Sequence, residues 1–352
     1  MKALRWHGRE DVRLEDVPTP EPTEFADSII EVSLCGVCGS DLAEYRQGPA
    51  MISPAAHPLS GKEPPVTLGH ELVGTLIEGG SPDGKIKVGA RVTVDACLRC
   101  GRCGACERGD YHLCRYGGAV GLHSDGAFAP LVAVPGYTLV EVPPGVHDRQ
   151  AALTEPFAVA LHGLERGGIA AGADVLVLGF GPIGAASALV AKALGANPHV
   201  VELDEGRRAR AAELGLPTWE PGDDLPKRAR TSLGEGGAPI VVETTGVASM
   251  VPVAVECASR GGRIVLLGLP TTPSEVSVRR VTLFERSLVG SLGYRHDLPR
   301  VLGLVAAGVL DPAAIVGNIV PLEDSAAEMK RLAEEPGATI KTLVATGQDA
   351  PT

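Results

Sequence analysis

Short apolar runs separated by Pro, Gly and charged residues fill the first part of the chain. Four of these runs, at residues 28–34, 72–77, 91–94 and 131–134, have the length and the β-branched content of strands. The pattern predicts an irregular β-rich domain in this part of the chain.

From about Leu153 onward, strand-like and helix-like patterns alternate. Strands are expected at 174–178, 199–203, 239–243 and 263–267, and helices at 156–166, 182–194, 206–214 and 251–258. Strands that alternate with helices predict a doubly wound parallel sheet. Residues 220–237 are polar and Gly-rich, so they are expected at the surface with at most a short helix.

The chain turns helical again after about Ser291. Helices are expected at 299–307 and 325–335, followed by a strand at 339–345. We expect this tail to return to the first domain. The predicted division is therefore one domain made of 1–152 and 291–352, and a second domain made of 153–290.

The composition is that of an ordinary globular protein, with 44% hydrophobic and 21% charged residues among 352. A formal net charge of −11 argues against nucleic acid or an anionic membrane surface as the partner. No stretch supplies the roughly eighteen uninterrupted apolar residues of a membrane helix, and the N-terminus lacks the apolar run of a secretory signal. We therefore expect a cytoplasmic protein.

Five of the eight cysteines lie within eighteen residues: Cys97, Cys100, Cys103, Cys106 and Cys114. In a reduced chain, repeated CxxC spacing is typical of a metal held by thiolates, and a redox pair is the alternative. A structural zinc takes four ligands, so one of these cysteines is spare. Such a closed site stabilises a loop and leaves no position for a substrate.

A GxGxxG motif, from Gly179 to Gly184, follows the first expected parallel strand and opens a helix. In that setting the motif is typical of a dinucleotide-binding turn. Gly179 permits the turn, Gly181 lets the backbone approach a pyrophosphate, and Gly184 allows close packing of helix and strand. Pro182 and Ile183 begin the helix, whose free N–H groups would hold the phosphates.

Glu202 lies eighteen residues after Gly184, close to the roughly twenty expected for the acid that binds the adenosine ribose. A carboxylate there accepts hydrogen bonds from the 2′-hydroxyl and repels a 2′-phosphate, which favours NAD over NADP. Arg207 and Arg208 argue the other way, because an arginine can receive that phosphate; otherwise they form a solvated helix start. Asp204 is the alternative for the ribose contact.

Donors for a second metal are spread over three segments. Cys38 lies in a CxxC, His70 and Glu71 in Gly-His-Glu, and Glu155 where the two domains meet. A thiolate, an imidazole and a carboxylate suit a catalytic zinc, which keeps one exchangeable position. Spacing alone does not select these residues, because a lone His-Glu pair is more often a turn or a salt bridge.

Five motifs follow one another along the chain: the Cys-Gly-Ser-Asp that begins at Cys38, the Gly-His-Glu that ends at Glu71, the cysteine lobe, the Glu-Pro at Glu155 and the glycine motif from Gly179. This is the order found in zinc-dependent medium-chain dehydrogenases, which the chain resembles over essentially its whole length. The resemblance implies a GroES-like β-rich catalytic domain, a Rossmann domain and two zinc ions per chain. It implies a catalytic zinc on Cys38, His70 and Glu71, with Glu155 bound to the metal or its water. The family spacing CxxCxxCx7C implies a structural zinc bound by Cys100, Cys103, Cys106 and Cys114, and Cys97 is then the spare cysteine.

The resemblance also implies roles around the catalytic zinc. Asp41 orients the metal ligands, Ser40 takes the hydroxyl proton of the alcohol, and Cys35 is a spare thiol. A histidine common in butanediol and sorbitol dehydrogenases is replaced by Ala43. The proton would then pass from Ser40 to water or to a ribose hydroxyl, with His57 as a substitute.

Residues 56–61, which include His-Pro-Leu-Ser-Gly, resemble an insert of 2,3-butanediol dehydrogenases; a stiff surface loop is the alternative. The resulting hypothesis is a zinc- and NAD-dependent dehydrogenase of secondary alcohols and ketones, in particular vicinal diols such as 2,3-butanediol and its ketone acetoin. The alternatives are a polyol, sugar-alcohol or biosynthetic alcohol dehydrogenase, and a non-catalytic nicotinamide sensor. The family suggests a homodimer or homotetramer.

Overall fold

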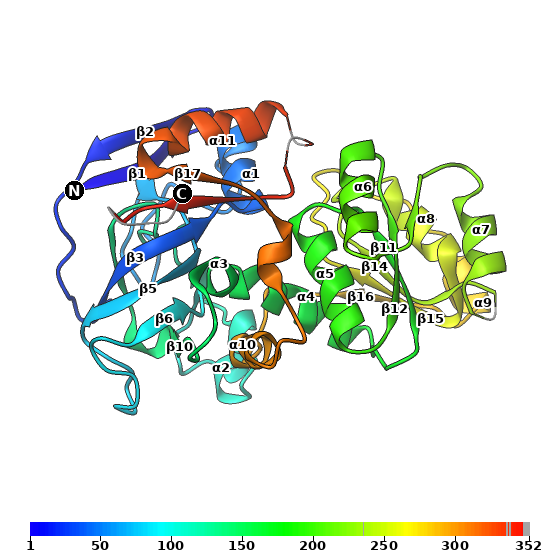
Figure 1. Cartoon of the computed structure of the whole chain (residues 1–352), viewed down its shortest axis with the longest axis horizontal. Coiled ribbons are helices and arrows are strands. Elements are labelled where there is room, and N and C mark those ends of the chain that lie inside the picture. Colours follow the sequence, from blue (N-terminus) through cyan, green and yellow to red (C-terminus); the bar gives the residue numbers. More distant parts are fainter. Residues whose placement is uncertain (235, 336, 338, 348–352) are drawn as a thin grey trace. The chain divides into compact units, whose positions relative to one another are not determined.

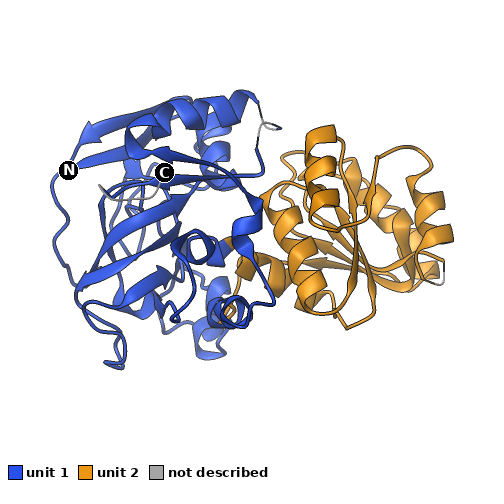
Figure 2. Ribbon diagram, in the orientation of Figure 1, with its two compact units in different colours: residues 1–155, 298–352 blue, residues 156–297 orange. Residues whose placement is uncertain are grey.

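The computed structural model describes residues 1–234, 236–335, 337 and 339–347. The chain forms two compact units, one made of residues 1–155 and 298–352 and the other of residues 156–297 (Figure 2). The predicted division lay at 152/153 and 290/291. The later return point has a physical reason, because residues beyond 290 stay attached to the second unit: the Ser291 N–H donates to the Leu266 carbonyl, and Asp297 pairs with His162.

The first unit is β-rich (Figure 1). Its main sheet has the order β10-β6-β5-β3-β18-β17, with β9 also on β3, and smaller sheets have the orders β2-β1-β4 and β7-β8. Its strands are β1 (Lys2–Gly8), β2 (Asp11–Asp16), β3 (Ser28–Gly36), β4 (Val66–Thr67), β5 (Glu71–Glu78), β6 (Arg91–Val94), β7 (Cys97–Leu98), β8 (Gly118–Ala119), β9 (Leu131–Val134), β10 (Leu139–Glu141), β17 (Val316–Pro321) and β18 (Lys341–Ala345).

Short helices connect these strands. They are α1 (Gly39–Gln47), α2 (Gly104–Glu107), η1 (Tyr111–Leu113), η2 (Gly136–Thr138), α3 (Asp148–Ala151), α10 (Leu298–Ala306), η3 (Pro312–Ile315), η4 (Leu322–Asp324) and α11 (Ser325–Glu334). One apolar core joins segments from both ends of the chain, since Leu72 and Phe128 cluster with Met329 and Val344. The C-terminal strand β18 pairs antiparallel with β3, so the tail completes the main sheet.

The second unit is a six-stranded parallel sheet in the order β13-β12-β11-β14-β15-β16. This is the 3-2-1-4-5-6 order of dinucleotide-binding folds. The strands are β11 (Asp174–Leu178), β12 (Asn197–Val201), β13 (Thr218–Trp219), β14 (Ala238–Glu243), β15 (Ala258–Leu266) and β16 (Ser287–Gly290).

Helices cover this sheet, with α5 against β11 and β12 and α8 against β14 and β15 (Figure 1). Residues 175–178 of β11 are completely buried, as expected for a central parallel strand covered on both faces. The helices are α4 (Thr154–Arg166), which begins at the boundary between the units, α5 (Pro182–Ala193), α6 (Glu205–Glu213), α7 (Leu225–Ser232), α8 (Met250–Cys257) and α9 (Val278–Leu283).

The expected elements of the second unit are confirmed with shifted ends. The strand predicted at 199–203 ends at Val201, and the one predicted at 263–267 is extended backward to Ala258. Residues 220–237 contain the short helix α7. In the first unit the pattern did not predict β1, β2, α1 or β17.

Candidate metal centres and dinucleotide site

Three donors from two separate segments converge in the first unit. Cys38 precedes helix α1, whereas His70 directly precedes β5 and Glu71 is its first residue. One ligand atom of each of these three residues lies within 4.8 Å of the others. A thiolate, an imidazole and a carboxylate at this separation fit a zinc with an exchangeable position.

Asp41 and Ser40, both on α1, surround the histidine. Asp41 Oδ2 accepts the backbone N–H of Cys38 at 2.9 Å, and its Oδ1 faces His70 Nδ1 at 3.7 Å, longer than a hydrogen bond. Ser40 Oγ lies 3.4 Å from His70 Nε2. Nδ1 thus faces a carboxylate, the arrangement that orients metal-binding histidines, and this leaves Nε2 as the nitrogen expected to bind a metal.

The electrostatics of the cluster favour a cation. Burial lowers the pKa of His70, but Cys38 and Asp41, with Glu155, outweigh it and hold the pKa well above its usual value. Burial also raises the pKa of Asp41. The groups that raise the pKa of His70 are the thiol of Cys38 and the carboxylates of Asp41 and Glu155, so anionic donors surround the imidazole.

A lysine that no sequence pattern singled out contacts one of these donors. Lys341 is fully buried, forms an ion pair with Glu71 Oε2 and donates to the Val37 carbonyl at 2.8 Å. Burial lowers the pKa of Lys341, but Glu71 and Cys38 raise it more, so the lysine stays charged. Glu71 Oε1 has no hydrogen-bond partner in the described part of the chain, which leaves it available to a metal.

Glu155, in the first turn of α4, is 9% exposed and close enough to raise the pKa values of His70 and Lys341. It does not belong to the group of donors within 4.8 Å. Its direct binding to the metal, or its contact through water, stays a prediction.

The four expected cysteines of the zinc lobe come together: Cys100, Cys103, Cys106 and Cys114. The sulfur of Cys103 lies 3.6 Å from that of Cys106 and 3.8 Å from that of Cys114. Four sulfurs held tetrahedrally about 2.3 Å from a zinc are about 3.8 Å apart, so the geometry fits. The N–H of Cys106 lowers the pKa of Cys103 to about 6, whereas burial and nearby thiols raise that of Cys106 to about 12. A zinc ion would let all four sulfurs bind as thiolates.

The lobe is anchored by Arg99, which the sequence also gave no reason to select. Its guanidinium lies 4.1 Å from the ring centre of Tyr111 and 4.5 Å from that of Tyr137, and it pairs with Asp95 at 3.0 Å. Stacking of this kind stabilises by about 0.5–2 kcal/mol per contact, depending on burial. Cys97 lies outside the four-sulfur group, and burial raises its pKa well above normal.

The Gly-rich turn has the geometry that the motif predicts. Gly179 has a φ of 94°, and a Cβ at Gly184 would lie 2.1 Å from the Gly179 carbonyl oxygen, so only glycine fits there. Gly181 precedes α5, and Pro182 is in its first turn. The backbone is thus open to a phosphate at a helix N-terminus.

Glu202 follows β12 directly and closes onto this turn. Its carboxylate accepts the N–H of Phe180 at 2.6 Å and that of Asp204 at 2.9 Å. Asp204 caps α6 by accepting the Arg207 N–H at 2.8 Å, so its Oδ1 is engaged. The Arg207 side chain approaches the turn, since its Nη1 lies 3.9 Å from a Cβ placed on Gly181.

His57 contacts the segment that follows the last cysteine of the zinc lobe. Its Nε2 lies 3.3 Å from the Gly117 carbonyl, its Nδ1 accepts the Leu59 N–H at 3.4 Å, and its ring packs against His123. Both ring nitrogens are engaged away from Ser40, so the structure does not favour His57 as a proton-relay substitute.

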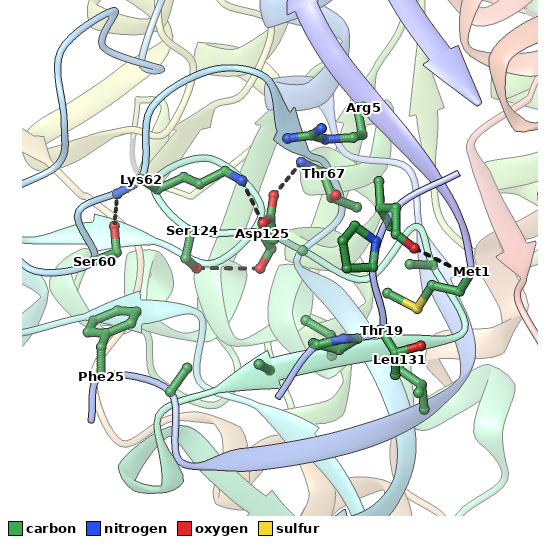
Figure 3. Close-up of a pocket in the computed structure, with 18 residues that line it drawn as sticks. Met1, Arg5, Thr19, Phe25, Ser60, Lys62, Thr67, Ser124, Asp125 and Leu131 are labelled. Atoms are coloured by element: carbon green, nitrogen blue, oxygen red, sulfur yellow. Dashed lines mark hydrogen bonds and ion pairs between the residues drawn. The ribbon is translucent and has the colours of Figure 1, made fainter. Parts of the chain in front are cut away.

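A separate cavity of about 390 Å³ opens in the first unit beside the N-terminal residues (Figure 3). Arg5, Phe25, Lys62 and Asp125 lie around it, and Lys62 and Asp125 form an ion pair at 2.6 Å. The expected metal donors are not among its lining residues. Among the described residues, no helix is both long and apolar enough to cross a membrane.

Comparisons with known proteins agree with both halves of the site. Residues 25–144 match the family of alcohol dehydrogenase GroES-like domains, and residues 182–307 match that of zinc-binding dehydrogenases. The (R,R)-butanediol dehydrogenase of Bacillus subtilis is 34% identical over 92% of this chain and 93% of its own length.

Solved structures extend the likeness to the fold. The 2R,3R-butanediol dehydrogenase of B. subtilis superposes with a TM-score of 0.90 at 33% identity, covering 98% of this chain and 99% of that one. A zinc-binding dehydrogenase of Sinorhizobium meliloti bound to NADP gives 0.86 at 31% identity, covering 98% of each chain. These comparisons give no support to a non-catalytic nicotinamide sensor. The expected architecture is confirmed, and the chain belongs to the zinc-dependent medium-chain alcohol dehydrogenases, oxidoreductases that use zinc and a nicotinamide cofactor.

Proposed function

We propose that this chain transfers a hydride between a secondary alcohol and NAD, with a vicinal diol such as 2,3-butanediol as the preferred alcohol and its hydroxyketone as the product. Oxidation releases one proton and passes two electrons with the hydride to NAD⁺. The convergence of Cys38, His70 and Glu71 within 4.8 Å carries the proposal, because these donors suit an open catalytic zinc. Substrate class is supported by the likeness to butanediol dehydrogenases.

Each residue has a role in that reaction. When bound, the zinc supplies a Lewis acid for the substrate oxygen, and the nicotinamide supplies the hydride acceptor. Ser40 accepts the hydroxyl proton, because its Oγ lies 3.4 Å from His70 Nε2 and so stands beside the donors. Asp41 holds the Cys38 backbone and faces His70, which fixes both donors. With Ala43 on the same helix, the proton continues from Ser40 to water.

The first unit is then the catalytic domain, and the second binds the dinucleotide on Gly179, Gly181 and Gly184. Glu202 favours NAD, because its carboxylate can accept hydrogen bonds from ribose hydroxyls and repels a 2′-phosphate. A carboxylate has about four acceptor positions, and backbone N–H groups take two of those of Glu202. The two that remain suit the ribose hydroxyls. Arg207, whose Nη1 lies 3.9 Å from a Cβ placed on Gly181, is the further residue that we expect to contact the bound cofactor.

A kinetic screen tests this function. Diols, polyols, sugar alcohols and ketones are assayed with NAD and with NADP, on protein whose zinc content has been measured. The highest kcat/KM is expected for 2,3-butanediol and acetoin with NAD. Preference for sorbitol or threonine over the diol would reject the substrate class while leaving the reaction class intact.

We also propose that the chain forms a homodimer or homotetramer in the cytoplasm. Within the described residues β16 is the last strand of its sheet, so one edge of its backbone is unpaired. Exposed apolar side chains lie on or near it, with Leu288 38%, Leu283 58% and Leu292 57% exposed. A second copy would cover both features. Light scattering on Leu288→Lys should show smaller particles than the parent.

A further inference from the structure

Lys341 places a full positive charge in the interior of the first unit. It opens β18, which pairs with β3, and its side chain is completely buried. Burying an ammonium group is costly unless it is paired and hydrogen-bonded. Its Nζ donates to the Val37 carbonyl at 2.8 Å and pairs with the Glu71 carboxylate. The lysine therefore contacts the residue before Cys38 and a proposed metal donor itself.

The backbone closes tightly over this pair. A Cβ on Gly36 would lie 2.2 Å from Glu71 Oε2 and 3.0 Å from Lys341 Cε. Real atoms do not approach so closely, so only glycine leaves room for the ion pair. The packing keeps Oε2 on the side of the lysine.

The two oxygens of Glu71 have different surroundings. Neither oxygen has a hydrogen-bond partner in the described part of the chain, but Oε2 forms an ion pair with the buried Lys341. The carboxylate also belongs to the donor group with Cys38 and His70. A carboxylate binds a cation through one oxygen or through both. Binding through both would fill a coordination position that a catalytic zinc must keep open.

We propose that Lys341 is a positioning residue that reserves one oxygen of Glu71, so that this carboxylate reaches a bound zinc through a single oxygen. The inference rests on the catalytic zinc of the proposed function. Because one oxygen is held, the coordination position needed by the alcohol oxygen stays open. The lysine thus keeps the site reactive and does not serve to tighten metal binding.

Cobalt(II) in place of zinc provides the test, since its visible spectrum reports coordination. The difference between the spectra of the parent and of Cys38→Ser isolates the signal of this site. Lys341→Met should weaken the visible bands as the coordination number rises, slow cobalt release by about 10-fold and lower kcat by about 10-fold or more, on the scale of outer ligand-shell changes. Binding of NAD should not change, and Lys341→Arg should resemble the parent.

A purely structural lysine predicts the opposite result. Lys341→Met would then release cobalt faster than the parent with an unchanged spectrum, which would overturn the proposal. If the parent gives no Cys38-dependent cobalt signal, the proposed catalytic zinc itself is wrong.

A second comparison remains decisive if Lys341→Met does not fold, because removing one partner of a buried pair is strongly destabilising. Glu71→Gln alone is compared with Glu71→Gln combined with Lys341→Met, which leaves no buried charge unpaired. The proposal predicts the same cobalt spectrum and release rate for both, since without the carboxylate the lysine has nothing to restrain. A clear difference between them would contradict it.

Discussion

Replacing Glu202 by Ala should change both the cofactor preference and the stability of the second unit. The carboxylate accepts two backbone N–H groups, those of Phe180 at 2.6 Å and Asp204 at 2.9 Å, and is 9% exposed. A hydrogen bond to a charged group contributes about 1.5–3 kcal/mol. Because water can enter the vacated space and satisfy the N–H groups in part, we expect a loss of about 2–4 kcal/mol.

The cofactor effect follows from charge. A unit charge about 4 Å from another interacts by about 4 kcal/mol at an effective dielectric constant of 20, so Glu202 opposes a 2′-phosphate by at least that amount before screening. Arg207 offsets part of this repulsion. We therefore expect the ratio of kcat/KM for NADP to that for NAD to rise at least about 10-fold in Glu202→Ala, equivalent to 1.4 kcal/mol.

The assay combines steady-state kinetics for both cofactors with urea unfolding. Glu205→Gln is the matched control, since it removes an exposed acid from the first turn of α6 without touching the Gly-rich turn. It should leave both the ratio and the stability near those of the parent. An unchanged cofactor ratio in Glu202→Ala, or a parent that already prefers NADP, would refute the assignment of Glu202 to the ribose.

Three further changes probe the metal sites and the C-terminal segment. Cys38→Ser should abolish turnover while the circular dichroism spectrum and NAD binding stay normal; measurable activity would exclude the catalytic zinc proposed here. Cys106→Ser should lower zinc from two ions per chain to one and the thermal midpoint by about 5–10 °C, because structural zinc contributes folding free energy; equal stability would show that the ligand set is wrong. Glu328 accepts hydrogen bonds from Arg331 at 2.8 and 2.7 Å and from Thr342 at 2.9 Å, and Arg331 lowers its pKa. A carboxylate whose pKa is lowered by folding stabilises the folded state at pH values above its unfolded pKa, and this stabilisation is lost as the pH falls through the folded pKa. Glu328→Gln should therefore cost about 1–2 kcal/mol at pH 7 and much less below pH ~4. Urea unfolding at both pH values measures this, and a cost independent of pH would argue against the ionised carboxylate.

The hydrophobic pattern predicted the parallel sheet better than the β-rich unit. The strand at 174–178 and the helix from Pro182 were predicted because a short continuous apolar run and a Gly-rich turn are local signals. Helix α1 was not predicted, although it carries Ser40 and follows Cys38. Its buried residues are Asp41 and Glu44, so no apolar face marks it in the sequence.

The site shows the same contrast. Spacing predicted a thiolate metal site among the five clustered cysteines, because four of them lie within fifteen residues from Cys100 to Cys114; the family resemblance chose these four and left out Cys97. Spacing did not select Cys38, His70 and Glu71, which only a family resemblance brought together. Glu202 was assigned to the cofactor, but its bonds to Phe180 and Asp204 depend on how β12 meets the Gly-rich turn.

The amino-acid sequence by itself determined the local chemistry of this protein: a run of thiols close enough to share a metal, and a glycine turn that opens a helix. Tertiary structure alone decided that Lys341 lies against Glu71, a residue 270 positions earlier in the chain. The reason is physical. Contacts between neighbours in the sequence are fixed by bond geometry and spacing, whereas β18 lies beside β3, which pairs with β5 on its other edge, only because one sheet and one apolar core join both ends of the chain.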